Sequence, residues 1–241
     1  MMLNKKSYIC HSVLLTEFQR MKKTSIILFV LVLSGIASVA QEKQPGEFRK
    51  FSLGFDLYTD IWQKMPENVD ASWLNRSINF YGLFNNQMGE SNFDFSYGLG
   101  MSVHNLYMDA LPYDKWGYTE FINIPDSISY DKAKITMAYV DIPLEIRYRA
   151  KSGFRAYLGF KFSVLVHQHS KFVGEDTNVG YDVTIKRDDV RYLELWQYTV
   201  YAKIGYKWIN VYGAYQLQPT FKKNQGPQMY PISVGLSIMP Y

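Results

Sequence analysis

Residues 93–104 read Phe93-Asp94-Phe95-Ser96-Tyr97-Gly98-Leu99-Gly100-Met101-Ser102-Val103-His104. Every odd position holds a bulky apolar side chain, and every even position holds a small, polar or charged residue. A period of two indicates a β-strand with two unlike faces, because successive side chains of a strand point to opposite sides. The same alternation recurs from residue 51 to residue 238, which predicts an all-β chain.

Segments with this pattern are separated by connections of two kinds. The eight candidate strands are about 51–61, 74–84, 93–104, 135–149, 154–167, 195–208, 211–218 and 232–238. Short connections follow the second, fourth and sixth strands, at 85–90, 150–153 and a tight turn at 209–210. Long connections follow the others, at 62–73, 105–134, 168–194 and 219–231. Such alternation is typical of a barrel with short periplasmic turns and long extracellular loops.

The apolar face of these strands is rich in aromatic residues. Tyr97, Tyr148, Trp196, Tyr206 and Trp208 lie near strand ends, where amphipathic rings favour a membrane interface. Aromatic residues are also common in soluble sheets. Long strands, sorted loops and an export signal together favour the membrane. We therefore predict an eight-stranded antiparallel up-and-down transmembrane β-barrel, with apolar side chains facing outer-membrane lipid and polar ones facing inward.

The start of the chain resembles an export signal. Met21-Lys22-Lys23 precedes a short apolar run, and Ser38-Val39-Ala40 places small residues before Gln41. The apolar run is about half of the ~20 residues that a membrane-spanning helix needs. We expect residues 21–40 to be a cleaved signal peptide, residues 1–20 to precede the true start, and 41–241 to be the barrel domain. The imperfect parity of the C-terminal Tyr241, after Pro240, weakens an otherwise typical aromatic end.

Cleavage before Gln41 would also change the composition. It removes the single cysteine, Cys10, so no disulfide or thiolate chemistry is expected in the exported chain. It removes five of the 26 basic residues and one of the 22 acidic ones, which leaves 21 of each. A near-neutral chain gives no reason to expect a nucleic-acid partner. No phosphate-binding glycine loop is present, and no cofactor is expected.

Two consecutive strands carry a recognisable motif. Residues 139–148 read YVDIPLEIRY, and after a turn residues 154–160 read FRAYLGF. This pair resembles the PorT-like outer-membrane β-barrel family of Bacteroidetes, whose members carry an aromatic-hydrophobic-acidic-Ile-Pro-Leu strand and then a Tyr-Leu-Gly strand. The resemblance implies a porin-like barrel in the outer membrane. PorT itself is implicated in type IX secretion, but no residue here singles out PorT from its relatives, and no catalytic motif defines the family.

Charged residues recur on the inward face of the predicted strands. They are Asp56, Asp94, Asp141, Glu145, Arg147, Arg155, Lys161 and Lys203. An eight-stranded barrel is just wide enough for side chains to fill it, and buried charges must be paired. We expect Asp141 to lie opposite Lys161, and Glu145 to lie near Arg155. A structural core of ion pairs is the favoured interpretation, and a proton or ion path is the alternative.

Histidines lie near the predicted extracellular ends of two strands. His167 and His169 share one strand face, a spacing that can bind a metal. His104 lies on a strand that is not their neighbour, and no carboxylate has a spacing that completes a site. We therefore assign no metal and expect solvated histidines. An outer-membrane lipid-modifying enzyme remains the alternative function, although Ser170 should point away from His169.

The third connection is unusually aromatic. Its aromatic residues include Tyr107, Tyr113, Trp116, Tyr118 and Phe121. Such a segment is too aromatic for a disordered linker, and aromatic residues are enriched at recognition surfaces. Either the loop packs on itself over the barrel mouth, or it binds a protein or glycan partner.

The predicted function follows from these patterns. We predict a non-enzymatic outer-membrane barrel that anchors or assists a surface or secretion complex through its loops. Residues 171–191, with alternation at 181–185, are expected to extend two strands beyond the membrane. A small-solute pore is disfavoured, because the predicted interior is filled.

Overall fold

The computed structural model describes residues 49–175, 181–188 and 190–239, all within one compact unit, Pro45–Tyr241. The predicted segments 1–20 and 21–40, and the terminal Tyr241, lie outside these residues. The described part contains strands and irregular segments, and none of it forms a helix long and apolar enough to cross a membrane.

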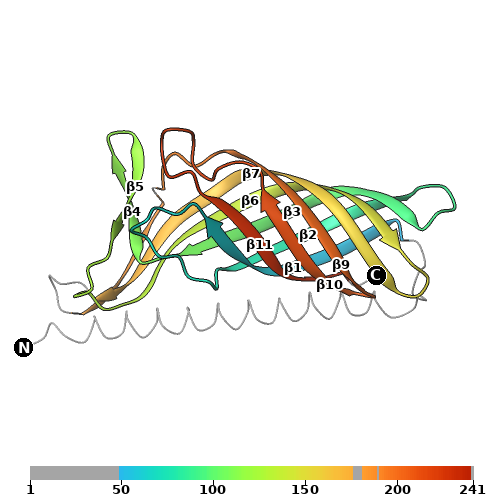
Figure 1. Ribbon diagram of the computed structural model, residues 1–241, viewed down its shortest axis with the longest axis horizontal. Coiled ribbons are helices and arrows are strands. Elements are labelled where there is room, and N and C mark those ends of the chain that lie inside the picture. The colour runs from blue at the N-terminus through green and yellow to red at the C-terminus, as the bar shows by residue number, and fades with distance from the viewer. Residues whose placement is uncertain (1–48, 176–180, 189, 240–241) are drawn as a thin grey trace, which may run out of the picture. The chain divides into compact units, whose positions relative to one another are not determined.

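Eight long strands form the wall of a barrel (Figure 1). They are β1 (Phe51–Gln63), β2 (Arg76–Gln87), β3 (Phe93–Tyr107), β6 (Tyr130–Arg149), β7 (Phe154–Glu175), β9 (Trp196–Tyr206), β10 (Ile209–Gln216) and β11 (Tyr230–Ile238). Their order around the wall is β6-β3-β2-β1-β11-β10-β9-β7, and β6 pairs with β7 to close the ring. Every pairing is antiparallel, which confirms the predicted eight-stranded up-and-down barrel.

The two faces of each strand differ as the alternation predicts. On β3, Asp94 and Ser96 are buried, whereas Leu99 is 65% exposed on the outer surface. On β7, Lys161 and Ser163 are buried inside. The outer surface therefore forms an apolar belt, as expected of a barrel wall that contacts the hydrocarbon of a membrane.

Aromatic rings gather at two levels of this belt. Phe93 lies 5.0 Å from Tyr148, ring centre to ring centre, near the short turns. Toward the long loops, Phe162 and Trp196 stack with their centres 4.9 Å apart. Two such rings, separated along the barrel, match the aromatic girdles at the two interfaces of a membrane barrel.

The structure also departs from the predicted element boundaries. The tight turn expected at 209–210 lies at Lys207 and Trp208, with a φ of 54° at Lys207, and Ile209 already begins β10. β6 and β7 are longer than expected, and β8 (Asp182–Arg187) pairs with the far end of β7. The predicted strand extension is therefore a β7–β8 hairpin rather than a longer β9, which starts at Trp196.

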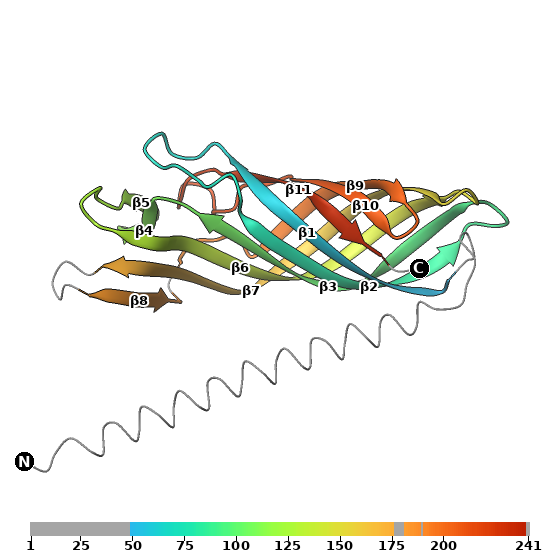
Figure 2. The same cartoon turned by 90° about the horizontal axis from the view of Figure 1, so that it is seen from below.

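The aromatic connection contains a second hairpin, formed by β4 (Ala110–Lys115) and β5 (Tyr118–Asn123). Both extra hairpins lie at the long-loop end of the barrel, opposite the short turns (Figure 2). β4 and β5 form their own two-stranded sheet. They therefore add a surface beyond the barrel wall without widening the barrel.

A cluster of apolar side chains lies inside the barrel toward the long-loop end. Its buried members include Leu106, Ile135, Met137, Phe221 and Met229. Their exposed fractions are at most 2%. The interior is therefore polar along its middle and apolar beneath the long loops.

Candidate binding cleft at the long-loop end

All eight charged side chains expected inside the barrel point inward. Asp56, Asp94, Asp141, Glu145, Arg147, Arg155, Lys161 and Lys203 are at most 4% exposed. They come from five different strands, so the closed wall brings together residues that are far apart in the sequence.

Glu145 and Lys203 are at the centre of the largest ion-pair network. Arg147 donates from Nε to Glu145 over 2.5 Å, and Lys203 Nζ lies 3.2 Å from the same carboxylate. Lys203 also lies 3.6 Å from Asp56 Oδ2 and donates to the Tyr81 hydroxyl over 2.7 Å. Buried charges need such partners, and here each of them has at least one.

The expected register of two ion pairs was partly wrong. Asp141 is opposite Ser163, and Lys161 is opposite Pro143, yet Lys161 Nζ still lies 3.4 Å from Asp141 Oδ2. Glu145 is opposite Gly159, four residues along β7 from Arg155, and its carboxylate pairs with Arg147 and Lys203. Long side chains reach along and across the lumen, so the facing residue on the next strand is not always the partner.

Large rings and paired charges leave little room in the middle of the lumen. Gly54 and Gly159 each leave space for a tyrosine, since a Cβ there would lie 2.2 Å from the ring of Tyr81 or Tyr201. The space left beside Asp56 is about 10 Å³. A water molecule needs about that much, so at this level the interior has no room for a larger solute.

His104 is not the solvated histidine that the sequence suggested. Its side chain is 15% exposed, and its Nδ1 lies 2.9 Å from Asp60 Oδ2. Its Nε2 lies 3.3 Å from the Tyr58 hydroxyl. Ser77 and Ser233 donate to the same carboxylate over 2.7 and 2.5 Å. These contacts give His104 a structural place in the polar interior.

A carboxylate lies close to His167 and His169. Donor atoms of His167, His169 and Asp188 lie within 4.8 Å of one another. The expectation that no carboxylate completes this pair is therefore wrong. Ser170 is buried and its hydroxyl bonds to the carbonyl of Arg187, so it is not paired with His169 as a nucleophile would be.

The β4–β5 hairpin displays one aromatic residue at its tip. Trp116 and Gly117 form the turn with φ of 54° and 89°, as a two-residue hairpin turn requires. Trp116 is 99% exposed, and Tyr113 and Tyr118 beside it are 54% and 39% exposed. A bulky residue is uncommon at positive φ, so the turn holds this indole in solvent at some conformational cost.

Two residues of the same aromatic segment are not available to a partner. Phe121 is 5% exposed and packs edge-to-face on Phe221, with ring centres 6.0 Å apart. Tyr107 is half-buried, with the Lys134 ammonium 5.2 Å from its ring centre. These two side chains fasten the segment, and Tyr113, Trp116 and Tyr118 form its exposed aromatic surface.

Polar contacts hold the hairpin against the neighbouring loops. Arg191 lies 2.9 Å from Asp114, and Thr119 donates its hydroxyl to the Arg191 carbonyl over 2.9 Å. The Thr119 amide also donates to the carbonyl of Gln225. At the exposed edge, the Glu120 carboxylate beside Lys115 raises the pKa of that ammonium. A hairpin fixed in this way presents its tip in one orientation.

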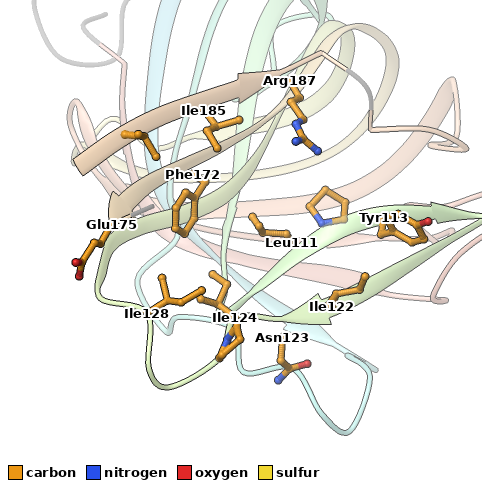
Figure 3. A pocket seen from close by; sticks show the side chains of 13 residues that line it. Leu111, Tyr113, Ile122, Asn123, Ile124, Ile128, Phe172, Glu175, Ile185 and Arg187 are labelled. Carbon is orange, nitrogen blue, oxygen red and sulfur yellow. The ribbon is translucent and has the colours of Figure 1, made fainter. Parts of the chain in front are cut away.

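A cleft of about 390 Å³ lies between the β4–β5 and β7–β8 hairpins (Figure 3). Its walls are mainly aliphatic and aromatic: Leu111, Pro112, Tyr113, Ile122, Ile124, Pro125, Ile128, Phe172, Val183 and Ile185. Asn123, Glu175 and Arg187 supply polar groups at its edges. Apolar walls with a few polar groups are typical of a binding site. The sequence signal for it was the alternation at 181–185, which we interpreted only as strand.

A family model supports the barrel assignment, and the comparison with solved structures found distant matches. The family model described as outer membrane protein beta-barrel domain matches residues 40–222. Two solved structures of Ail, the attachment invasion locus protein of Yersinia pestis, are 10% and 9% identical to this chain, with TM-scores of 0.34 and 0.36. Each match covers 78% of this chain and 97% of Ail, and one of the structures holds the heparin analogue sucrose octasulfate.

No curated protein matches the sequence. The family model covers most of the chain, including the strands β1 to β10. In this family's membrane orientation the long loops are extracellular and the short turns periplasmic. The chain belongs to the outer membrane protein beta-barrel domain family and is an outer-membrane β-barrel.

Proposed function

We propose that this barrel binds a protein partner at the cell surface through the β4–β5 hairpin and the adjoining cleft, and so anchors or assists a surface or secretion complex. The observation that carries the proposal is Trp116, fully exposed on a hairpin that Asp114 and Thr119 hold in place. Exposed Trp and Tyr side chains dominate the binding energy of many protein interfaces.

The chemistry of the cleft favours an apolar protein segment over a sugar. Its aliphatic side chains, such as Leu111, Ile122 and Ile185, offer no hydrogen bonds to hydroxyl groups. β8 is the last strand in the sheet order, so within the described residues one of its edges pairs with no strand. An extended segment could add to that edge while its side chains enter the cleft.

The resemblance of residues 139–160 to the PorT-like family supports a secretion complex as the setting. The barrel interior supports a non-enzymatic role, because its charged side chains form ion pairs with one another. Export by cleavage of residues 21–40 is part of the same proposal, with a start at Gln41. Mass analysis of the N-terminus of protein taken from outer membranes tests that start.

Replacement of Tyr113, Trp116 and Tyr118 by serine tests the binding function. A photo-crosslinking residue at position 115 of the wild type should capture a specific protein, and the triple variant should lose it. The matched control is Trp73→Ser, which removes an exposed indole, 80% accessible, from the β1–β2 connection. Heat-modifiable migration on gels shows whether each barrel is folded.

The outcomes separate the proposal from its alternatives. Loss of the partner in the triple variant alone supports hairpin binding. Retention of the partner by that variant refutes it. Capture of glycan but no protein would reassign the partner class. Altered lipid A or phospholipid on deletion of the gene, reproduced by His167→Ala or His169→Ala, would favour the lipid-modifying enzyme.

A further inference from the structure

A β-bulge turns two histidines of β7 out of the barrel. The register with β6 shifts between Ala138, opposite His167, and Tyr139, opposite Leu165, so Val166 is an extra residue. Before the bulge the odd-numbered residues of β7 are buried, and beyond it the even-numbered ones are buried. His167 and His169 therefore share the outward side of the strand, above the level of Trp196. Bulges often redirect side chains in this way near functional sites.

The β7–β8 hairpin brings a carboxylate to the same place. Ser170 is opposite Arg187, the last residue of β8, and Asp188 follows directly after it. Nitrogen atoms of both imidazoles and an oxygen of Asp188 lie within 4.8 Å of one another. The two imidazole rings are 5.3 Å apart, centre to centre. Three ligand groups thus converge from β7 and from the end of β8, which the hairpin brings together.

One atom of this cluster lacks a partner. His169 Nδ1 is buried from solvent and makes no hydrogen bond to any described residue. A buried polar nitrogen without a partner is costly, and a bound ion would remove that cost.

We propose that His167, His169 and Asp188 form a binding site for a divalent transition-metal ion of the Zn²⁺ type. Two imidazoles and one carboxylate are a ligand set that Zn²⁺ accepts, with a further position left for water. Ligands around tetrahedral Zn²⁺ lie roughly 3.4 Å apart for bonds of ~2.1 Å. The separations between the ligand atoms, at most 4.8 Å, therefore need to shorten by about 1.4 Å or less, a rotamer adjustment available to residues at the exposed end of a hairpin.

The residues around the three ligands leave room for a metal ion and favour transition metals over other cations. Lys186 lies 3.8 Å from Asp188, and both side chains are more than half exposed, so this weak pair can be displaced. Lys134 is also near and lowers the affinity for ions held by charge alone. Asp188 lines an open hollow of about 420 Å³ with Gln168 and Tyr192, which leaves solvent access to the metal. Imidazole ligands and nearby lysines together disfavour Ca²⁺ and Mg²⁺.

A bound ion would fasten the end of β8 to β7. Val183, Ile185 and Arg187 of β8 form one wall of the cleft, so the metal would hold that wall in place. The site does not depend on what the cleft binds. It is a separate property of the β7–β8 hairpin.

The test uses protein purified from outer membranes without a polyhistidine tag. Calorimetric titration with Zn²⁺ should give saturable binding of one ion per chain, and Co²⁺ should give visible absorption bands of a low-symmetry nitrogen–oxygen site. His169→Ala and Asp188→Asn should each weaken binding at least ~10–100-fold, the cost of losing even a supporting residue of a metal site. Glu175→Gln, which removes a carboxylate from the same hairpin, should bind as wild type.

Each outcome decides the proposal. All variants must keep heat-modifiable migration, which shows that they are folded. In folded Asp188→Asn, the Co²⁺ absorption spectrum must change in shape and the affinity for the metal must fall. Absence of saturable Zn²⁺ binding up to about 1 mM overturns the site. Equal binding by wild type and folded His169→Ala does so as well, because the metal would then lie elsewhere. Equal loss in Glu175→Gln would show a nonspecific charge effect and would also overturn it.

Discussion

Removal of the lysine partner of Asp141 should destabilise the barrel strongly. Lys161 Nζ lies 3.4 Å from Asp141 Oδ2, and the two side chains are 4% and 1% exposed. Neither carboxylate oxygen of Asp141 makes a hydrogen bond within the described residues. Lys161→Met keeps the length of the side chain but leaves the carboxylate buried beside an apolar group. We expect the free energy of unfolding to fall by about 3–5 kcal/mol.

The magnitude agrees with the geometry of the pair. At 3.4 Å and an effective dielectric constant of about 20, the attraction between two unit charges is about 5 kcal/mol. Desolvation of both groups cancels much of this attraction in the wild type, but the single variant keeps the desolvation of Asp141 and loses the attraction. The double change Lys161→Met with Asp141→Leu should therefore recover part of the loss.

Urea-dependent unfolding in lipid vesicles measures these differences, with tryptophan fluorescence and gel mobility as independent readouts. Lys151→Met is the matched control, because it makes the same substitution at an exposed turn residue. The control should unfold as the wild type does. A Lys161→Met barrel that is equally stable would refute the reasoning, and it would mean that water reaches and solvates Asp141.

Other expectations concern the wall and the lumen. Leu99→Arg, at a side chain 65% exposed on the belt, should cost ~2–4 kcal/mol in lipid, and no loss in the same unfolding assay would mean that this face does not meet hydrocarbon. Gly98→Ala should cost ~1–3 kcal/mol, because its Cβ would lie 1.9 Å from the Gly82 carbonyl oxygen, whereas Gly213→Ala meets nothing within 4 Å and should be tolerated. The wild type should show no steady conductance in planar bilayers, and stable open channels would contradict a filled lumen.

The sequence alone was enough to predict the barrel fold. Alternation along the strand, as in 93–104, is a local property, and it fixes which side chains share a face before any tertiary contact forms. Sorting of short and long connections then gave the strand number and the up-and-down order. The inward positions of residues such as Asp141 and Lys203 followed from parity. The aromatic tip of the third connection could also be found as a segment, although not as a hairpin.

The tertiary structure decided which side chains contact one another. Glu145 meets Lys203 because closure of the wall brings β6 and β9 to one lumen, and no spacing along the chain encodes that distance. The single extra residue in β7 reverses the faces beyond it, so parity counted from the membrane gives the wrong side for His169. Phe121 turns inward because Phe221 lies beneath it. These contacts depend on strand register, bulges and loop packing, and each of these is decided by the sum of many small interaction energies over the whole barrel. The alternation of apolar and polar residues, in contrast, is a local property of each strand.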